Sequence, residues 1–125
     1  MKKKEKLYET LGELLFAVAK ADGEIQIEER ESLRSLLKHH TWASEIKWSF
    51  DYEEARGSSV EETYNKVINF CHGYGPTAEY EEFIDAMKFV AKSSKGISEN
   101  EEVIISSFSK DLIDRFQRDL DILRK

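Results

Sequence analysis

Hydrophobic residues recur every three or four positions along most of this chain, which is the spacing of amphipathic helices. In the first such segment these positions are Leu7, Leu11, Leu14, Leu15 and Val18. Gly23 follows as a residue suited to a left-handed helix stop. A second run of leucines begins after Glu28 and Glu29, whose charges favour the first turn of a helix. Residues 6–39 are therefore predicted to form an αα-hairpin.

The rest of the chain continues the helical pattern. Residues 41–52 favour a short helix, although their aromatic residues also alternate as in a strand. Four further helices are predicted to follow capping residues at Ser59, Thr77, Ser98 and Ser109. Glu62 and Glu101 complete capping-box patterns with Ser59 and Ser98. The helix after Ser98 is apolar over much of its circumference, so we expect it to be central. The fold class is all-α, a single domain of six or seven helices.

Two of the helix-to-helix junctions resemble each other. They are AKADGEIQIEE at 19–29 and AKSSKGISENE at 91–101, and matching Ile25 to Ile97 sets an offset of 72 residues. Without a gap, 11–37 then aligns with 83–109, and six of the 27 positions are identical, where composition alone gives about one or two. The other matches are mainly apolar. This pattern predicts two pseudo-repeated αα-hairpin units.

Length and charge limit the classes of function. The 125 residues suit one domain (1–125), in which 1–5 form a flexible basic N-terminus. A formal net charge of −6 disfavours nucleic-acid binding, which depends on basic side chains that displace counterions from phosphates. It favours cations or basic partners instead.

The sequence indicates the cytoplasm. No stretch approaches the roughly 20 apolar residues that span a bilayer, so we expect no membrane insertion. Glu5 follows the run Lys2, Lys3 and Lys4 directly, without the apolar region of a signal peptide. The single cysteine, Cys71, cannot form an internal disulfide, which agrees with a reducing compartment.

Acidic residues gather at the first junction. They are Asp22, Glu24, Glu28 and Glu29, with Glu13 on the preceding helix. The segment Asp22-Gly23-Glu24-Ile25, together with Glu29, matches the second half of an EF-hand calcium loop. Val18 and Lys20 occupy positions where the first half needs carboxylates, so an EF-hand is rejected. Two interpretations stay open. The residues either cap and stabilise two helix ends without a ligand, or present oxygens to Ca²⁺ or Mg²⁺.

The first junction also resembles the TerB-like (tellurite resistance) domain family. The residues that carry the resemblance are Ala19, Ala21, Asp22, Gly23, Ile25, Glu29 and Leu33. It spans residues 7–109 when the second junction is counted. It implies an all-helical fold with an internal pseudo-repeat, a stress-response setting, and divalent-metal binding through Asp22 and Glu29 with Glu28 beside them. Ser94 and Lys95 replace the Asp-Gly pair in the second copy and leave only Glu101 of the acidic set, which argues against two symmetrical acidic sites.

An aromatic segment is the candidate partner-binding surface. Trp42, Trp48, Phe50 and Tyr52 lie close together in the chain, and any pair among them that faces solvent marks a protein-binding patch. We single out Trp42, Trp48 and Tyr52. A protein partner is expected.

The candidate chemistry elsewhere is weak. His39, His40, Cys71 and His72 lack the spacing that sets zinc ligands on one face. No nucleophile motif or phosphate loop occurs, so we expect no enzyme. The sequence predicts a non-catalytic binding or scaffold module that binds a divalent cation weakly at the acidic junction. The alternatives are a metal-assisted hydrolase that uses the same carboxylates and a homo-oligomeric structural protein that uses 42–52.

Overall fold

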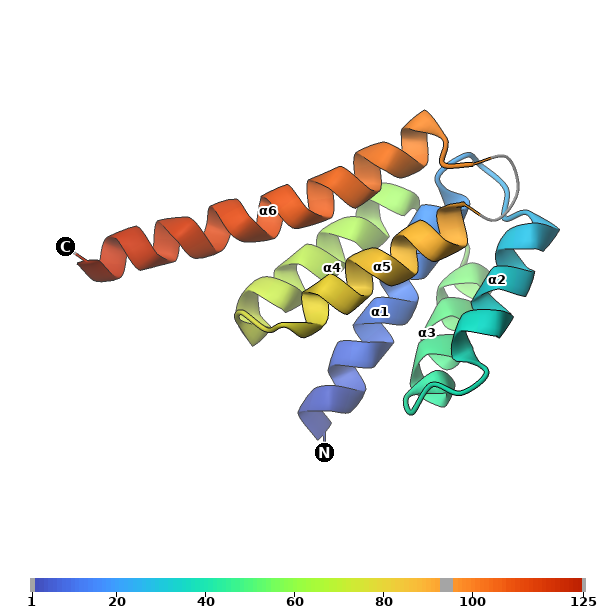
Figure 1. Ribbon diagram of the computed structural model, residues 1–125, viewed down its shortest axis with the longest axis horizontal. Helices are drawn as coiled ribbons and strands as arrows, with labels where there is room; N and C mark the ends of the chain where they lie inside the picture. Colours follow the sequence, from blue (N-terminus) through green and yellow to red (C-terminus); the bar gives the residue numbers. More distant parts are fainter. Residues whose placement is uncertain (1, 93–95, 125) are drawn as a thin grey trace.

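The computed structural model describes residues 2–92 and 96–124, which form six α-helices and no strand (Figure 1). The helices are α1 (Lys2–Lys20), α2 (Ile27–Leu37), α3 (Ala43–Arg56), α4 (Val60–Tyr74), α5 (Glu79–Ala91) and α6 (Glu99–Arg124). The predicted all-α class is confirmed. The helix in the ambiguous segment 41–52 is also confirmed, and it extends further than the aromatic spacing indicated.

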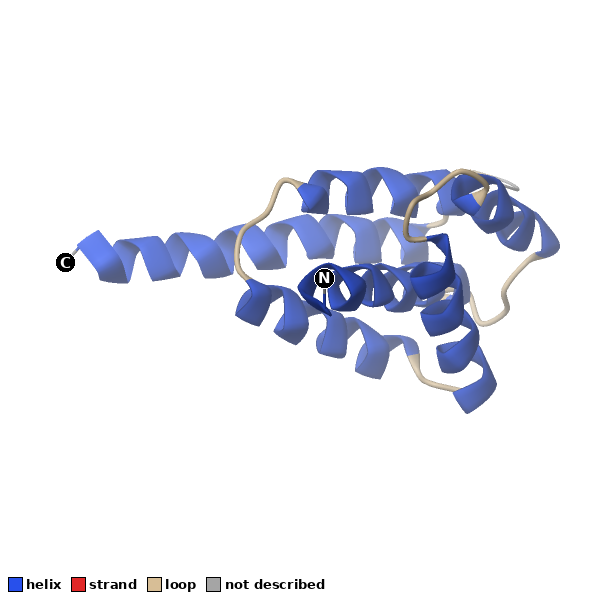
Figure 2. Ribbon diagram, turned by 90° about the horizontal axis from the view of Figure 1, so that it is seen from below, coloured by secondary structure: helices blue, strands red, loops and turns tan. Residues whose placement is uncertain are grey.

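The central element is α1. It packs against α3 most extensively and also against α4, α5 and α6, and Figure 2 looks along it from its N-terminal end. The side chains of α1 that are at most 1% exposed are Leu7, Leu11, Leu14, Leu15, Phe16, Ala17, Val18 and Ala19. The prediction that the helix after Ser98 is central was therefore wrong. The unbroken apolar run 14–19 makes α1 hydrophobic on all sides, which suits a helix surrounded by others.

Gly12 lets α1 and α3 approach each other closely. A Cβ atom built on Gly12 would lie 2.3 Å from the carbonyl oxygen of Ile46 and 2.9 Å from the Cβ atom of Ser49. No side chain larger than hydrogen fits there unless one helix moves. The glycine therefore sets the distance between the two helices.

The first two helices do not form the predicted hairpin. α2 packs against α5 and, more lightly, against α3, and it makes at most marginal contact with α1. The connection 21–26 carries the chain across the end of the bundle, and Figure 1 shows α2 beside α3 and away from α1. The buried side chains of Leu33 and Leu37 belong to the common core. The leucine pattern thus predicted which face of α2 is buried, but not the helices that cover it.

α6 is one continuous helix, so the helix start predicted at Ser109 was wrong. No glycine or proline follows Gly96, and Ile105, Phe108 and Leu112 continue one buried face across the serine. The chain therefore has six helices in its described residues. Figure 1 shows the C-terminal part of α6 projecting beyond the other helices. The large hydrophobic side chains exposed near the end of this part are Leu120, Ile122 and Leu123.

Some helix ends follow the local signals in the sequence and others do not. Ser59 caps α4 by accepting a hydrogen bond from the Glu62 N–H (3.1 Å), and Gly23 has a φ of 101° after α1. Thr77 is not the N-cap of α5, which begins one residue later than predicted, with Ala78 as N-cap. Residues 2–5 lie in α1, where a flexible N-terminus was expected, because Lys and Glu are good helix formers. Lys4 also lies 3.6 Å from Glu79.

None of the described helices is long and apolar enough to cross a membrane.

Candidate functional sites at the helix junctions and on α3

The two similar junctions lie side by side. At the first junction, one carboxylate oxygen of Asp22 accepts hydrogen bonds from the Ser98 hydroxyl (3.0 Å) and the Asn100 side-chain amide (3.1 Å). Figure 1 shows the connection between α1 and α2 beside the start of α6, at the upper right. Asp22 therefore ties the end of α1 to the start of α6.

Two buried glutamates meet beneath this contact. Glu29 and Glu101 are 4% and 3% exposed, and a hydrogen bond links their side chains. Each also accepts a hydrogen bond from a backbone N–H at its own helix start, Glu29 from Gln26 (2.8 Å) and Glu101 from Ser98 (2.9 Å). Both are capping-box contacts. The one predicted at Ser98 and Glu101 is confirmed.

Glu29 has a strongly raised pKa. Burial, together with the hydrogen bond and negative charge of Glu101, raises the pKa of Glu29 to about 8, while the Gln26 N–H opposes the shift. The neutral form of Glu29 is therefore favoured near neutral pH. We call Glu29 and Glu101 the carboxyl pair.

The other predicted cation ligands do not join this pair. Glu24 and Glu28 are exposed on the first junction. Glu13 lies on a different side of α1, where its carboxylate is 2.6 Å from the Lys66 ammonium. In the described part of the chain, no group of three or more His, Cys, Asp or Glu side chains is placed to hold a metal ion. The ligand set named from the sequence is therefore dispersed.

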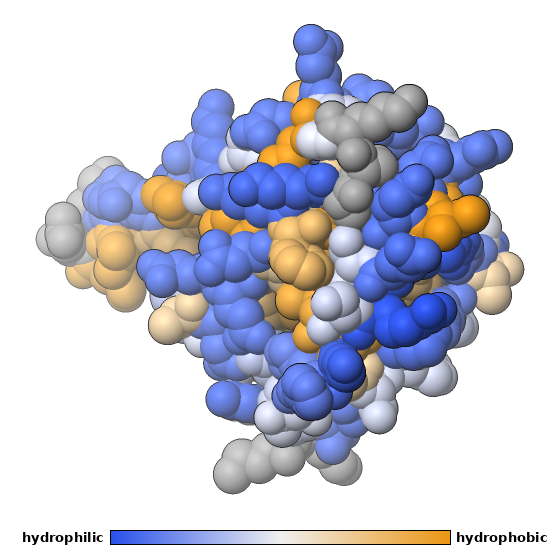
Figure 3. Space-filling view, turned by 45° about the vertical axis from the view of Figure 1, so that its right-hand side comes forward, coloured by the Kyte–Doolittle hydropathy of each residue, from blue (hydrophilic) through white to orange (hydrophobic). Residues whose placement is uncertain are grey.

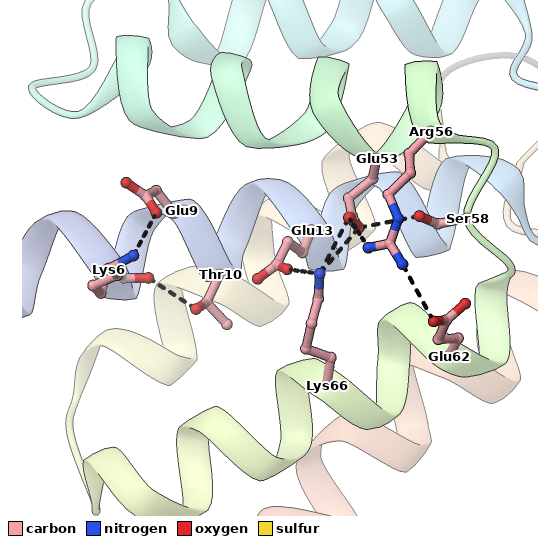
Figure 4. Close-up of polar contacts among 9 residues, drawn as sticks. All are labelled: Lys6, Glu9, Thr10, Glu13, Glu53, Arg56, Ser58, Glu62 and Lys66. Carbon is pink, nitrogen blue, oxygen red and sulfur yellow. Dashed lines mark hydrogen bonds and ion pairs between the residues drawn. The ribbon is translucent and has the colours of Figure 1, made fainter.

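Lys66 links α1, α3 and α4 through a second cluster of charges (Figure 4). Its ammonium lies between Glu13 of α1 and Glu53 of α3, 3.1 Å from the latter. Glu53 is 1% exposed and also accepts a hydrogen bond from the Ser58 hydroxyl (3.3 Å). Burial raises the pKa of Glu13 even though Lys66 opposes this shift. The ammonium thus compensates two largely buried carboxylates, which indicates a structural role.

The aromatic segment divides into a packed ring and an exposed pair. Trp42 is partly buried and stacks on Tyr8, with ring centroids 5.6 Å apart. Trp48 and Tyr52 are 60% and 49% exposed, and their rings stack on each other on α3 with centroids 5.4 Å apart. They stand four residues apart, so they share one face of the helix. Of the three residues named from the sequence, two form the solvent-facing pair and Trp42 does not.

Two of the three histidines, His40 and His72, and the cysteine are accounted for by local contacts. His40 lies 2.8 Å from a Glu82 carboxylate oxygen, and His72 lies 3.2 Å from one of Asp119. Cys71 is fully buried, and burial raises the pKa of its thiol to about 12. A thiol in this state is a poor nucleophile.

Open grooves lie away from the carboxyl pair. An apolar groove of about 390 Å³ runs between α5 and α6 and includes Tyr80, Ile84 and Ile113 in its lining. A smaller groove of about 280 Å³ lies between α2 and α3. Neither groove is lined by Asp22, Glu29 or Glu101.

Comparisons of the sequence with protein-family models, with curated proteins and with solved structures found no match. The TerB-like resemblance therefore stays a prediction. It rests on the residues of the first junction, above all Asp22, Gly23 and Glu29.

Proposed function

We propose that this protein is a non-catalytic binding or scaffold module of the cytoplasm and that it docks a partner protein on α3. The observation that carries the proposal is the stacked, exposed pair Trp48 and Tyr52. We call this pair the aromatic patch.

Large aromatic rings that are exposed to solvent favour the binding of a partner. Tryptophan and tyrosine dominate the binding energy of many protein interfaces because they bury a large area and lose few rotamers. The two rings of the aromatic patch already stack on each other, so little further order is lost on binding. Trp42 shows the alternative use of such a ring, since it is partly buried and stacks on Tyr8.

We further propose that the chain is a TerB-like domain with a pseudo-repeat and a role in stress response. Two features support this assignment. The hydrogen bonds from Gln26 to Glu29 and from Ser98 to Glu101 are equivalent contacts at the two junctions. The junctions also lie against each other through Asp22, as two halves of a duplicated unit do when they meet about a common axis.

A binding role is favoured over a metal-assisted hydrolase. Such an enzyme needs a metal with an open coordination position beside a substrate cleft. Glu29 is instead buried and hydrogen-bonded to Glu101 and to the Gln26 N–H. The grooves between α5 and α6 and between α2 and α3 open elsewhere.

The test compares two double variants in the native cells. Trp48→Ala/Tyr52→Ala removes the aromatic patch, and Phe89→Ala/Val103→Ala removes two side chains of similar exposure on α5 and α6. We expect the wild type and the control variant to co-purify one partner that the first variant loses. Both variants should melt within about 3 °C of the wild type, because surface substitutions change stability little. Equal recovery of the same partner by all three proteins would contradict the proposal, as would recovery of none.

The same variants address self-association. If the aromatic patch joined copies of this chain, light scattering on the purified wild type would give a multiple of the 14.6 kDa chain mass, and Trp48→Ala/Tyr52→Ala would return it to the monomer. That result would mean that the aromatic patch joins copies of this chain and does not dock a different protein.

A divalent cation at the first junction is a second candidate, favoured by the carboxyl pair. Two adjacent buried carboxyl groups can bind a hard cation in place of a proton when the pH rises above the pKa of Glu29, which is about 8. Asp22 is close enough to add its negative charge to the pair. We expect a weak site for Ca²⁺ or Mg²⁺ there.

The cation is tested by thermal unfolding at about pH 9 and about pH 6 with millimolar Ca²⁺ or Mg²⁺. Stabilisation is expected only at the higher pH, where the proton no longer competes. Asp22→Asn/Glu29→Gln should abolish it. Glu24→Gln/Glu28→Gln, which removes as much charge from exposed positions, should retain it. A wild-type melting temperature that the ions leave unchanged at both pH values would remove the cation and leave the docking proposal intact.

A further inference from the structure

The groove between α2 and α3 has an apolar floor and a basic rim. Its volume is about 280 Å³. The floor is formed by Leu33, Leu37 and Phe50, and the rim by Arg30, Arg34, Lys38, Lys47 and the single acidic residue Asp51. Four basic side chains around one groove are unexpected on a chain whose formal net charge is −6. We call it the basic groove.

The rim keeps positive charge that this chain does not neutralise. Arg30 makes a bidentate pair with Glu54 of α3, and Lys47 lies 2.7 Å from Asp51. The remaining two rim cations are Arg34 and Lys38, which are exposed and pair with no acidic side chain among the described residues. A bound anion can therefore gain two new ion pairs without breaking an existing one.

Helical spacing produces this arrangement. Arg30, Arg34 and Lys38 follow one another at intervals of four residues, so they form a ridge along α2. Leu33 and Leu37 form the neighbouring ridge on the side of the core, and both are largely buried. The sequence therefore sets a row of cations beside a row of leucines.

We infer that the basic groove binds an acidic peptide segment that carries one bulky apolar side chain and belongs to the partner protein. This inference rests on the proposed function, because the groove adjoins the aromatic patch. Lys47 and Asp51 on the rim immediately precede Trp48 and Tyr52 on α3, so the two surfaces occupy neighbouring ridges of one helix. A segment that fills the groove can continue over the patch.

The size and shape of the groove favour a peptide side chain. Its volume lies just below the roughly 300–1,000 Å³ typical of small-molecule pockets, and its floor is already mostly covered, since Leu33 and Leu37 are each 7% exposed. It therefore admits one apolar side chain, while the flanking carboxylates reach the rim. Figure 3 brings the α2 side forward and shows hydrophilic side chains around small, separate hydrophobic patches. A nucleic acid or an anionic membrane would extend beyond the basic rim and be repelled by the acidic remainder of the chain, whereas a short acidic segment stays beside the basic residues of the groove.

The test measures fluorescence anisotropy of labelled peptides of about 12 residues. The first peptide is rich in Asp and Glu with a central Phe, the second replaces that Phe by Ser, and the third replaces every acidic residue by Lys. We expect the first to bind, the second to bind at least about tenfold more weakly, and the third not to bind. Affinity for the first should fall with added salt.

Charge-reversal variants locate the peptide. Arg34→Glu/Lys38→Glu should weaken binding of the first peptide by at least about tenfold. Lys88→Glu/Lys110→Glu changes the net charge equally at exposed positions on α5 and α6, and it should bind nearly as the wild type does. Equal weakening by both variants, or no binding of the first peptide, would overturn the inference. Preference for phosphatidylserine vesicles, or a concentration-dependent rise in mass that Arg34→Glu/Lys38→Glu removes, would also overturn it, in favour of a membrane or a second copy.

Different results would contradict the docking proposal for the aromatic patch and the acidic-segment inference for the basic groove. If Trp48→Ala/Tyr52→Ala loses the cellular partner while no peptide binds the groove, the docking function stands and the acidic-segment inference falls. If the first peptide binds with the expected charge selectivity while Trp48→Ala/Tyr52→Ala keeps its partner, the groove is a peptide site and the aromatic patch is not the docking surface.

Discussion

The side chains of Glu29 and Glu101 are hydrogen-bonded to each other in the interior, although each stands in the first turn of a different helix. Each carboxyl group also caps its own helix through a backbone N–H. The contact therefore ties the start of α2 to the start of α6.

This pair should make the protein less stable as the pH rises. The pKa of Glu29 is about 8 in the folded chain, against an ordinary value of 4.5, so between these values the folded state binds more protons than the unfolded state. The stabilisation is complete below about pH 4.5 and is lost as the pH approaches and passes 8. We expect the free energy of unfolding contributed by this group to fall by on the order of 2 kcal/mol, less than the full shift implies, because solvent near the exposed Asp22 screens the pair.

Urea unfolding over a pH series measures this effect. Glu29→Gln, which keeps the shape and removes the titration, should flatten the dependence and be more stable than the wild type above about pH 8. Glu28→Gln on the exposed side of α2 should leave the dependence unchanged. A wild type that gains stability from pH 5 to pH 8 would contradict the raised pKa of Glu29.

Gly12→Ala should destabilise the protein although alanine is the better helix former. The added methyl group would meet the Ile46 carbonyl oxygen at 2.3 Å, so α1 and α3 must separate, at a cost of about 2–3 kcal/mol. Gly73→Ala in α4 is the matched control, because no atom lies within 4 Å of its new Cβ atom. It should gain about 0.5–1 kcal/mol. Chemical unfolding of both variants gives the comparison, and a stabilised Gly12→Ala would disprove the close approach.

Lys66→Met should expose the repulsion between Glu13 and Glu53. Without the ammonium, Glu13 lacks its counter-charge and Glu53 keeps only the more distant Arg56 (3.9 Å), so we expect a loss of about 3 kcal/mol near pH 7. The loss should shrink in acid, since the carboxyl groups then take up protons. Adding Glu13→Gln to Lys66→Met should restore part of the stability. A loss below about 0.5 kcal/mol, as for an ordinary surface position, would argue against the cluster.

The projecting end of α6 should be dispensable for folding. Leu120, Ile122 and Leu123 are 47%, 69% and 81% exposed, so a chain that ends at Asp119 should melt within about 3 °C of the full chain. Differential scanning calorimetry checks this. A much larger decrease would mean that these side chains are covered in solution, and light scattering on the full chain would show whether a second copy covers them.

Local patterns in the sequence predicted the helices and several of their ends. Periodicity predicted the all-α class, and the Ser98–Glu101 capping box predicted the start of α6 because both groups lie within one helical turn. The helix start predicted at Ser109 was wrong because a serine can cap a helix or lie inside one. Only the continued burial of Phe108 and Leu112 on either side distinguishes the two.

The candidate site was predicted in part. The first junction was identified from its acidic residues, but Glu101 was treated only as a remnant of the second copy, and its pairing with Glu29 was missed. Spacing within a helix says nothing about which distant turns touch, and this contact depends on how α2 and α6 cross the end of the bundle. The 72-residue offset between the junctions matches Glu29 to Glu101, and this match was the available signal for their pairing.

The basic ridge of Arg30, Arg34 and Lys38 could also be predicted from its intervals of four residues. The groove beside it could not, because α3 forms its other side.

Photo-crosslinking in living cells tests the docking surface most directly. A photoreactive phenylalanine analogue placed at Tyr52 should give one discrete adduct with a partner protein, because this ring lies exposed in the aromatic patch on α3. The same analogue at Phe89 on α5, a ring of similar exposure, should give none. No adduct at Tyr52, or the same adduct at both positions, would contradict a docking role for α3.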